Sequence, residues 1–568
     1  MEVSREDRVT APERSGSAAT ETAPAERRWW QRWPHVSVGL WSFGVFAAVL
    51  VIRNAYLFST KIYENQDYAA NTIAILQAKH FQLLLGNYSK ENFYHPGPAF
   101  LYVMAAGESL FHDALHLVPT PWNGQLLAIL LLNATLLSLT VAVIARHASS
   151  TRVTLVCALL VVLFVALHPL TVNSSWFPYL YFAPALLMLV SAASVATGET
   201  FALPVLALSA WLCIHGQAEF LVFAPPTAIV ALAGHFWARR KNQTKMFGGA
   251  WHWIGAAVIS ALFALPIVIY TAQHWPGEFL QYWRYRQHVA RSGQIHHTLI
   301  TSISYTMRFW WPGKPSTAYG DLPGTVIALV LTAVAVLLAV RCPVPRLRRF
   351  LLWSLAMAGV MTVIFVYYAQ TAISDNNLRT QSYLGYFSWA APLIVVLVIA
   401  AGAVVHLRDG RTVVLPLVAA VAAGAVVATV VPQYQEDRFD PPAKYVGVPQ
   451  LPQLVRTMAT ASGDRSIVVR IDQGAWFDAV GVVAYGDRIG RRACVVGPRW
   501  VVLFRSQSVC SPAEARTGVT FWFYDPRQTQ VPPGQVLVAR LPDSLVTRQL
   551  SNRSQASAAD NLAGLRPR

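Results

Sequence analysis

The sequence is poor in charge, poor in cysteine and free of the patterns that bind nucleotides. Asp, Glu, Lys and Arg make up 13% of its 568 residues, whereas hydrophobic residues make up 54%, and the mean hydropathy is +0.40. Soluble proteins of this length carry much more charge, so the composition predicts insertion into a membrane. The absence of a Gly-rich phosphate loop argues against a nucleotide-dependent enzyme.

The positive charge does not indicate a nucleic-acid partner. The net charge is +17, but the basic residues form short clusters between apolar runs and do not follow one continuous face. We therefore interpret them as signals of membrane topology and expect no binding of nucleic acid.

Cysteine is equally scarce. Of the five cysteines, Cys494 and Cys510 alone fall in a polar region, because the others lie in or beside apolar segments. This pair is the candidate disulfide, and such a bond requires an oxidising compartment.

The apolar runs predict an all-α polytopic membrane domain over residues 35–431, preceded by a disordered cytoplasmic tail at 1–34. A spanning helix needs about 20 apolar residues. Eleven runs fit, near 36–53, 123–145, 153–170, 178–196, 200–215, 219–237, 251–272, 323–341, 350–368, 386–405 and 412–431.

The run from Pro98 to Phe111 decides the topology, because counting it as a span would invert everything after it. It extends over only about 21 Å as a helix, so we place it on the outer surface as an interfacial or re-entrant helix. The basic clusters then all fall in the cytoplasm, which agrees with the positive-inside rule. They lie near 27–32, 146–152, 239–245, 341–349 and 408–411.

The same topology places loops 54–122 and 273–322 outside, together with the polar segment 432–550. That segment has the strand-like runs of a small exoplasmic α/β domain, and residues 551–568 resemble a disordered tail. The predicted strands are Ser466–Ile471, Gly481–Tyr485, Trp500–Phe504, Val519–Tyr524 and Gln535–Leu541.

The first outer loop holds the candidate catalytic acids, Glu64 and Asp67, a few residues beyond the first span. A carboxylate at the bilayer surface suits a general base that deprotonates an attacking hydroxyl. The alternative is a structural role, in which Asn65 or Asp67 caps a helix over Tyr68–Lys79.

The same loop contains His95 in a rigid His-Pro-Gly-Pro turn, with Pro98 in the first turn of the short surface helix. His95 at the helix entrance could donate to a phosphate or support the acid. The alternative is an ordinary turn.

The eleven runs together resemble the architecture of the GT-C superfamily of polyprenyl-phosphate-sugar-dependent glycosyltransferases. The motifs DYA, GNYS and HPGP between residues 67 and 98 resemble those of its bacterial members. The resemblance in architecture covers about 36–431. It implies that an acid in this loop is the catalytic base. By position this is Asp67, with Glu64 as the fallback, because the paired-acid motif of some members is interrupted here by Asn65 and Gln66.

The second outer loop is rich in cations, against the positive-inside trend, which suggests an anionic ligand such as a lipid phosphate. A headgroup-binding surface is the alternative. The candidate ligands are Arg284, Arg286, His288, Arg291, Arg308 and Lys314. Arg284 and Arg286 would diverge in a helix and converge on one phosphate only in extended backbone. The His296-His297 pair has no adjacent carboxylate in the sequence, so a divalent metal is possible but not indicated. No cofactor is expected.

A third outer segment offers groups that suit hydroxyl and phosphate recognition, although a plain polar turn is an equal alternative. These residues are Asp375, Asn376, Arg379 and Tyr383. His215, Gln217 and Glu219, between two spans, could line a cavity, but an ordinary turn is favoured.

These features predict an inverting transfer of sugar from a polyprenyl-phosphate donor to an exoplasmic glycan, lipid or protein in a bacterial plasma membrane. A transporter or flippase would place ionisable residues deep within its spans, where few are found. A non-enzymatic scaffold would depend on residues 432–550 instead. A transferase for a phosphate-linked or acyl group would share the same site.

We predict a cytoplasmic N-terminus and an exoplasmic C-terminal domain, because all five basic clusters agree. In a cysteine-free background, Gln530→Cys should react with an impermeant thiol reagent from outside the cell. Labelling only after the membrane is opened would contradict this topology.

Overall fold

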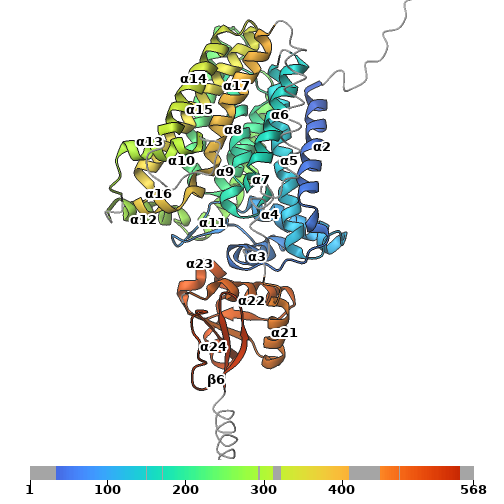
Figure 1. Ribbon diagram of the computed structural model, residues 1–568, viewed down its shortest axis with the longest axis vertical. Coiled ribbons are helices and arrows are strands. Elements are labelled where there is room, and N and C mark those ends of the chain that lie inside the picture. Colours follow the sequence, from blue (N-terminus) through green and yellow to red (C-terminus); the bar gives the residue numbers. More distant parts are fainter. Residues whose placement is uncertain are drawn as a thin grey trace, which may run out of the picture.

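The computed structural model describes residues 34–550, apart from 149, 169, 292–294, 311–321, 408–447 and 473. A bundle of long helices forms one part of the molecule, and a small α/β domain hangs from one end of it (Figure 1). The predicted fold class is confirmed, since the chain is a multi-pass helical membrane protein with a small C-terminal sheet.

Within the described residues, eight helices are long and apolar enough to cross a membrane. Two shorter apolar helices, α6 (Thr151–Leu167) and α9 (Leu203–Gly216), stand among them, and the predicted run 412–431 lies outside the described residues. The long helices are α2 (Pro34–Arg53), α5 (Pro121–His147), α8 (Phe182–Ala196) with its preceding turn, α10 (Phe220–Lys241), α11 (Ala250–Gln273), α14 (Leu322–Arg341), α15 (Pro345–Ala372) and α17 (Ala390–His406) with its preceding turn.

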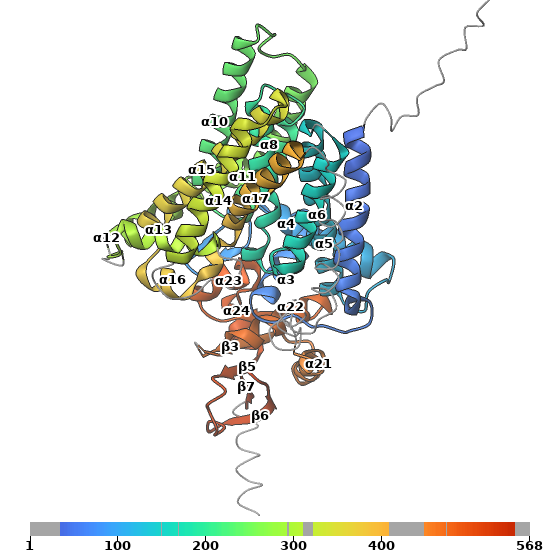
Figure 2. The same ribbon diagram turned by 45° about the horizontal axis from the view of Figure 1, so that its top comes forward.

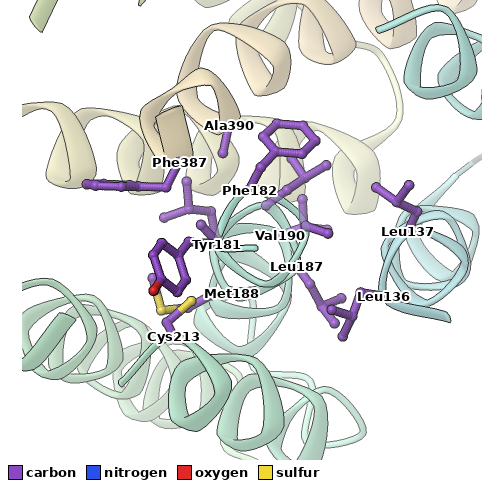
Figure 3. Packing of buried hydrophobic residues seen from close by; sticks show 14 of the residues in the cluster. Leu136, Leu137, Tyr181, Phe182, Leu187, Met188, Val190, Cys213, Phe387 and Ala390 are labelled. Carbon is purple, nitrogen blue, oxygen red and sulfur yellow. The ribbon is translucent and has the colours of Figure 1, made fainter. Parts of the chain in front are cut away.

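Helix α8 forms the centre of the bundle. All its residues are buried, which is the expected state of a helix that is apolar on every side. Its side chains meet Leu136 and Leu137 of α5 on one side and Cys213 of α9 on another, while Phe387 and Ala390 cover a third (Figure 3).

The first long loop folds into short elements between the bundle and the C-terminal domain. These are a 3₁₀ turn (Ala55–Phe58), α3 (Gln66–Lys79), the hairpin β1 (Tyr88–Ser89) and β2 (Phe93–Tyr94), α4 (Ala99–Gly107) and a π-helical segment, Glu108–Ala114. Helix α4 therefore corresponds to the short helix predicted between Pro98 and Phe111. It is not among the eight long helices.

Helix α4 approaches α5 closely because both have glycine at the contact. A Cβ atom on Gly107 would lie 2.5 Å from the carbonyl oxygen of Gly124, and one on Gly124 would lie 2.9 Å from that of Gly107. No side chain fits at such distances, so the contact requires both glycines.

The C-terminal domain contains a five-stranded sheet in the order β4-β3-β5-β7-β6. Strands β3, β4 and β5 pair in parallel, whereas β7 pairs antiparallel with β5 and β6. The bounds are β3 (Ile467–Ile471), β4 (Ala493–Val495), β5 (Val519–Tyr524), β6 (Gln535–Arg540) and β7 (Leu545–Gln549), with helices α21 (Leu451–Ser462), α22 (Trp476–Arg488), α23 (Val501–Phe504) and α24 (Pro512–Thr517).

Two predicted strands are wrong. Gly481–Tyr485 lies inside helix α22, and the predicted strand Trp500–Phe504 consists of the last residue of a 3₁₀ turn followed by helix α23. Helix α22 is buried along most of its length because it packs against both the sheet domain and α3, so its apolar residues show no helical periodicity. Strands β4 and β7 were not predicted.

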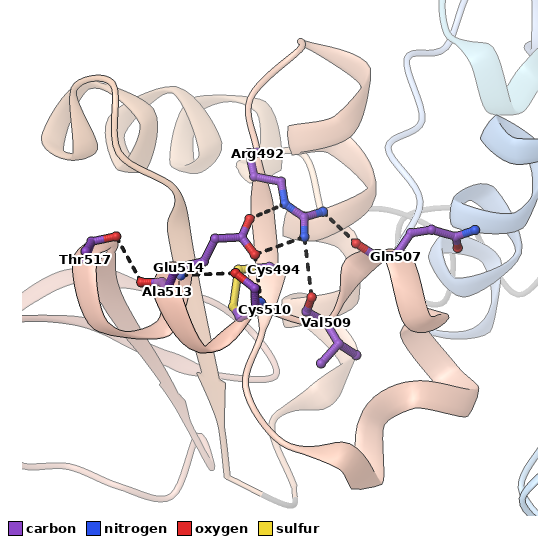
Figure 4. Close-up of a disulfide and its surroundings, with 9 residues drawn as sticks. Arg492, Cys494, Gln507, Val509, Cys510, Ala513, Glu514 and Thr517 are labelled. Atoms are coloured by element: carbon purple, nitrogen blue, oxygen red, sulfur yellow. Dashed lines mark hydrogen bonds and ion pairs between the residues drawn. A yellow bond between two sulfur atoms is a disulfide. The ribbon is translucent and has the colours of Figure 1, made fainter.

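Cys494 and Cys510 are joined by a disulfide that ties β4 to the turn before α24 (Figure 4). Beside it, Arg492 pairs with Glu514 at 2.7 Å and donates to the carbonyl of Gln507. Glu514 also closes the capping box of α24 with Ser511.

The C-terminal domain is attached to the first loop by a buried ion cluster. Arg488, at the end of α22, contacts Glu64 at 2.9 Å and Glu108 at 2.5 Å, and Lys79 contacts Glu108 at 2.9 Å. Thr72 also donates to Glu64. Both views place α22 directly against α3 (Figures 1 and 2).

Apolar contacts complete this junction. Ala69, Ala70 and Ile73 of α3 belong to the same buried cluster as the core of the C-terminal domain. Burial raises the pKa of Glu108, but the charge and hydrogen bonds of Arg488 outweigh it and lower the pKa overall. The ionised carboxylate therefore stabilises the fold above about pH 4.5, and this contribution is lost as the pH falls through the lowered pKa.

We predict that Arg488→Met lowers the free energy of unfolding by about 3–5 kcal/mol, because it leaves Glu64 and Glu108 buried with too little positive charge. Denaturant unfolding of the purified protein measures this loss. Arg527→Met is the matched control, since Arg527 is 94% exposed and lies 3.8 Å from its partner, Asp525. Equal losses in both variants would contradict a role for the buried cluster.

Candidate functional site

A cavity of about 440 Å³ lies where the first loop meets the bundle. Its walls come from segments that are far apart in the sequence: the first loop, the turns near residues 176–181 and 217–222, helix α12 (Glu278–Arg291), the end of α15, and residues 377–384. Aromatic side chains dominate the walls, including Tyr88, Phe93, Trp176, Tyr181, Tyr282, Trp283, Tyr285, Tyr368 and Tyr383.

Asp67 lies in the cavity wall, in the first turn of α3. Its Oδ2 accepts a hydrogen bond from the indole of Trp176 at 2.7 Å, and its Oδ1 accepts one from the hydroxyl of Tyr88. A carboxylate has about four acceptor positions, so it can receive a further hydrogen from a group in the cavity.

The alternative role of Asp67 as a helix cap is wrong. The cap position of α3 belongs to Asn65, whose side chain makes no capping bond, and the helix begins at Gln66. Gln66 has a φ of +51°, a left-handed conformation that is uncommon outside glycine. The turn that presents Asp67 is therefore held in a conformation that the chain does not favour by itself.

The phenol of Tyr88 remains a hydrogen-bond donor at any physiological pH. Burial is the main cause, followed by the neighbouring Asp67 carboxylate, and together they raise the pKa of Tyr88 well above its ordinary value of 10. Two donors thus fix the orientation of the Asp67 carboxylate.

Glu64 is not in the cavity wall. It is buried in the ion cluster with Arg488 and accepts a hydrogen bond from Thr72. The environment of Glu64 therefore differs from that of Asp67, because the carboxylate of Glu64 is already paired with the guanidinium of Arg488.

His95 lines the cavity, but its ring acts as an acceptor. Nδ1 receives the backbone N–H of Ala218 at 3.0 Å, and burial lowers the pKa of His95 to about 3. The imidazole is therefore neutral and offers a phosphate one N–H donor but no positive charge. Its proton resides on Nε2, because Nδ1 must accept.

Among the described cations predicted in the second loop, Arg286 lines the cavity, and Lys90 of the first loop lines it as well. The guanidinium of Arg286 donates to the hydroxyl of Tyr367 at 3.2 Å. Because α12 is a helix, Arg284 diverges from Arg286 and does not line the cavity, as expected for residues two apart on a helix.

The other described cations predicted in this loop do not line the cavity. His288 and Arg291 are exposed on α12, whereas Arg308 is buried with its guanidinium 4.3 Å from the centre of the Tyr305 ring. Lys314 lies outside the described residues.

In the third segment, Tyr383 lines the cavity and its ring packs edge-on against Trp176 at 5.0 Å. Asp375 instead binds the second loop, because it accepts hydrogen bonds from the backbone of His296 and from Nδ1 of His297, the latter at 2.6 Å. Asn376 and Arg379 are exposed and lie outside the lining.

The C-terminal domain reaches the back of this site through the hairpin β1–β2. Arg505 is buried, donates to the carbonyl of Gly86 at 2.6 Å and lies 4.9 Å from the centre of the Tyr94 ring. Burial lowers the pKa of Arg505 to about 10. On its other side Tyr94 meets α12, since Tyr282 donates to its carbonyl and its own N–H donates to Glu278.

The described part of the chain contains no cluster of residues typical of a metal site. There, no three His, Cys, Asp or Glu side chains lie together in a way that could hold a metal ion.

The fold has a counterpart among solved structures. ArnT from Cupriavidus metallidurans, solved with undecaprenyl phosphate, superposes with a TM-score of 0.53 at 12% identity, covering 92% of this chain and 98% of that one. The chain has the GT-C fold. The archaeal oligosaccharyltransferase AglB from Archaeoglobus fulgidus, solved with an inhibitory peptide and a dolichol-phosphate, matches at 11% identity over 88% of this chain and 70% of that one, with a TM-score of 0.37.

The likeness is one of fold, because the identity is far too low to carry residue roles. Neither protein-family models nor curated protein sequences give a match. The fold that the resemblance to the GT-C superfamily implied is thus confirmed.

Several cavity residues have a larger part in the site than the sequence indicated. Tyr88 lies inside the GNYS string, yet no spacing rule connects it to Asp67. Trp176 follows a polar break, Asn-Ser-Ser, in an apolar region, and this break is the one signal that could have marked it. Gln217 and Glu219 line the cavity, against the favoured ordinary turn, while His215 instead contacts the carbonyl of Phe263.

We predict that Arg286→Ala weakens binding of a lipid phosphate by about tenfold or more, the loss expected for one charge-assisted hydrogen bond. Arg284→Ala is the matched control on the same helix, exposed and outside the cavity, and should retain full affinity. Titration with undecaprenyl phosphate distinguishes them. Equal weakening in both variants would show that α12 attracts lipid headgroups by charge alone.

Proposed function

We propose that this protein is an inverting glycosyltransferase that moves a sugar from a polyprenyl-phosphate donor to an acceptor hydroxyl. The observation that carries the proposal is the setting of Asp67, because two donors hold its carboxylate in the wall of a cavity that also contains Arg286 and Lys90. The match to ArnT, a protein solved with undecaprenyl phosphate, supports a lipid phosphate as the ligand.

In this mechanism Asp67 removes the proton of the acceptor hydroxyl. The oxygen attacks the anomeric carbon of the sugar, the bond from that carbon to the phosphate oxygen breaks, and the lipid phosphate leaves with the bonding electrons. Attack from the face opposite the leaving group inverts the configuration. Arg286 and Lys90 stabilise the negative charge that develops on the departing phosphate.

The size and lining of the cavity fit this reaction. A cavity of about 440 Å³ is within the range of small-molecule sites and has room for one sugar with its phosphate. Aromatic faces are suited to the apolar faces of sugar rings. Tyr88 and Trp176 hold Asp67 from the side of the protein, so that its free acceptor positions can turn to the ligand.

The proposed setting is the outer face of a bacterial plasma membrane, with the N-terminus in the cytoplasm and the C-terminal domain outside. The acceptor is then a glycan, a lipid or a protein of the cell envelope. No step of the mechanism requires a nucleotide, since the lipid phosphate is the leaving group.

We predict that Asp67→Asn lowers the rate of sugar transfer by about 10²–10⁴-fold, because the amide cannot accept the proton. Asn keeps the volume and one acceptor oxygen, so binding of the lipid should be largely retained. The measurement is single-turnover transfer in liposomes loaded with undecaprenyl-phosphate sugars.

Glu64→Gln is the control for this experiment. It should lower stability, because it weakens the pair with Arg488, yet the folded fraction should transfer sugar at a normal rate. A normal rate in Asp67→Asn and a lost rate in folded Glu64→Gln would transfer the role of base to Glu64. Normal rates in both variants would refute the catalytic role of this loop.

A further inference from the structure

The turn that contains Gln217–Glu219 joins α9 to α10 and forms part of the cavity wall. Its position is fixed from two sides. The N–H of Ala218 donates to His95, and the hydroxyl of Tyr181 donates to the carbonyl of Gly216 at 2.8 Å. The neutral ring of His95 thus has a definite structural role, which is to hold this turn against the first loop.

Glu219 is a second carboxyl group in the cavity, and the mechanism above does not use it. Its Oε2 is buried without a hydrogen-bond partner among the described residues. Burial raises the pKa of Glu219 to about 7, and it outweighs hydrogen bonding from the side chains of Tyr368 and Gln217, which favours the charged form. Burial therefore favours the neutral acid at this position.

Glu219 and Asp67 share one chamber but differ in character. Tyr383 lies within electrostatic range of both. Asp67 accepts hydrogen bonds from two protein donors, whereas Glu219 has a buried oxygen, Oε2, that accepts none from the described residues. A buried polar atom without a partner is costly, and cavity walls tolerate such an atom where a ligand completes the environment.

The chemistry of the neighbours defines that ligand. A protonated carboxyl, an amide and a phenol can each both donate and accept a hydrogen bond, and so can a sugar hydroxyl. A phosphate is a poor partner for this group, because it is anionic and is better served by Arg286 and Lys90 in the same cavity.

We propose that Glu219, together with Gln217 and Tyr368, forms the subsite that recognises a hydroxyl group of the donor sugar. This inference rests on the proposed function and adds to it the part of the cavity that distinguishes the sugar from its lipid carrier. In this arrangement Arg286 and Lys90 bind the phosphate and Asp67 deprotonates the incoming acceptor. Glu219 forms a hydrogen bond with a hydroxyl of the sugar ring.

The experiment compares two ligands in the Asp67→Asn background, in which turnover is slow. Affinities for undecaprenyl phosphate and for undecaprenyl phosphate carrying glucose, mannose or arabinose are measured by titration in nanodiscs. The ratio of the two affinities reports the contribution of the sugar alone. We expect Glu219→Leu to lower this ratio by about tenfold, the loss of roughly one hydrogen bond with its partner left unpaired. Affinity for the bare lipid phosphate should not change.

Two further variants make the result decisive. Glu219→Gln keeps both hydrogen-bonding functions without a titrating group, so it should retain most of the ratio. Glu199→Gln, an acid that pairs with Arg346 at 2.9 Å outside the cavity, should behave as the unmodified site does.

The outcomes separate the inference from the function on which it rests. If the Asp67→Asn protein binds neither ligand, the proposed function is wrong. If it binds bare undecaprenyl phosphate but none of the three sugars increases the affinity, or if Glu219→Leu retains the increase, the subsite is wrong while lipid binding stands. If Glu219→Leu weakens both ligands equally, Glu219 supports the cavity and does not recognise sugar, which also refutes the inference.

Discussion

The position of Asp67 depends on the buried charge cluster beneath helix α3. Arg488 of the C-terminal domain binds Glu64, two residues before α3 begins, and Glu108, which follows α4. In a medium of low dielectric constant such a pair is strong only while every charge is compensated, so the three groups hold their relative positions closely. Since α3 carries Asp67 in its first turn, the cluster fixes where the carboxylate enters the cavity.

The C-terminal domain is therefore part of the architecture of the site, although none of its described residues lines the cavity. Its α22 packs on α3, and its Arg505 and the carbonyl of Val501 hold the hairpin that carries Tyr88 and Tyr94. The hairpin in turn contacts α12, which contributes Arg286 to the cavity wall. A change in the position of this domain would therefore displace Asp67 and Arg286 together. This coupling suits a site in which both charges act on one substrate.

Much of this arrangement could be predicted from the sequence, because membrane spans and their flanking charges follow simple physical rules. The spans, the short helix near Pro98 and the α/β character of the last domain follow from apolar length and composition. Helix α22 was mistaken for a strand because its burial on several sides removes the periodic signal. The partners of Asp67 could not be predicted, since Tyr88 and Trp176 are 21 and 109 residues away from it. The same limit applies to Arg286, whose selection over Arg284 depends on which face of α12 meets the cavity.

The measurement that tests this account most directly is a cryo-EM structure of the protein in nanodiscs with undecaprenyl phosphate. The account predicts density for the phosphate inside the cavity, within hydrogen-bonding distance of Arg286 or Lys90, and an open space between the phosphate and Asp67 that is large enough for a sugar ring. A phosphate bound elsewhere on the protein, with the cavity empty or filled by the acyl chain alone, would contradict it.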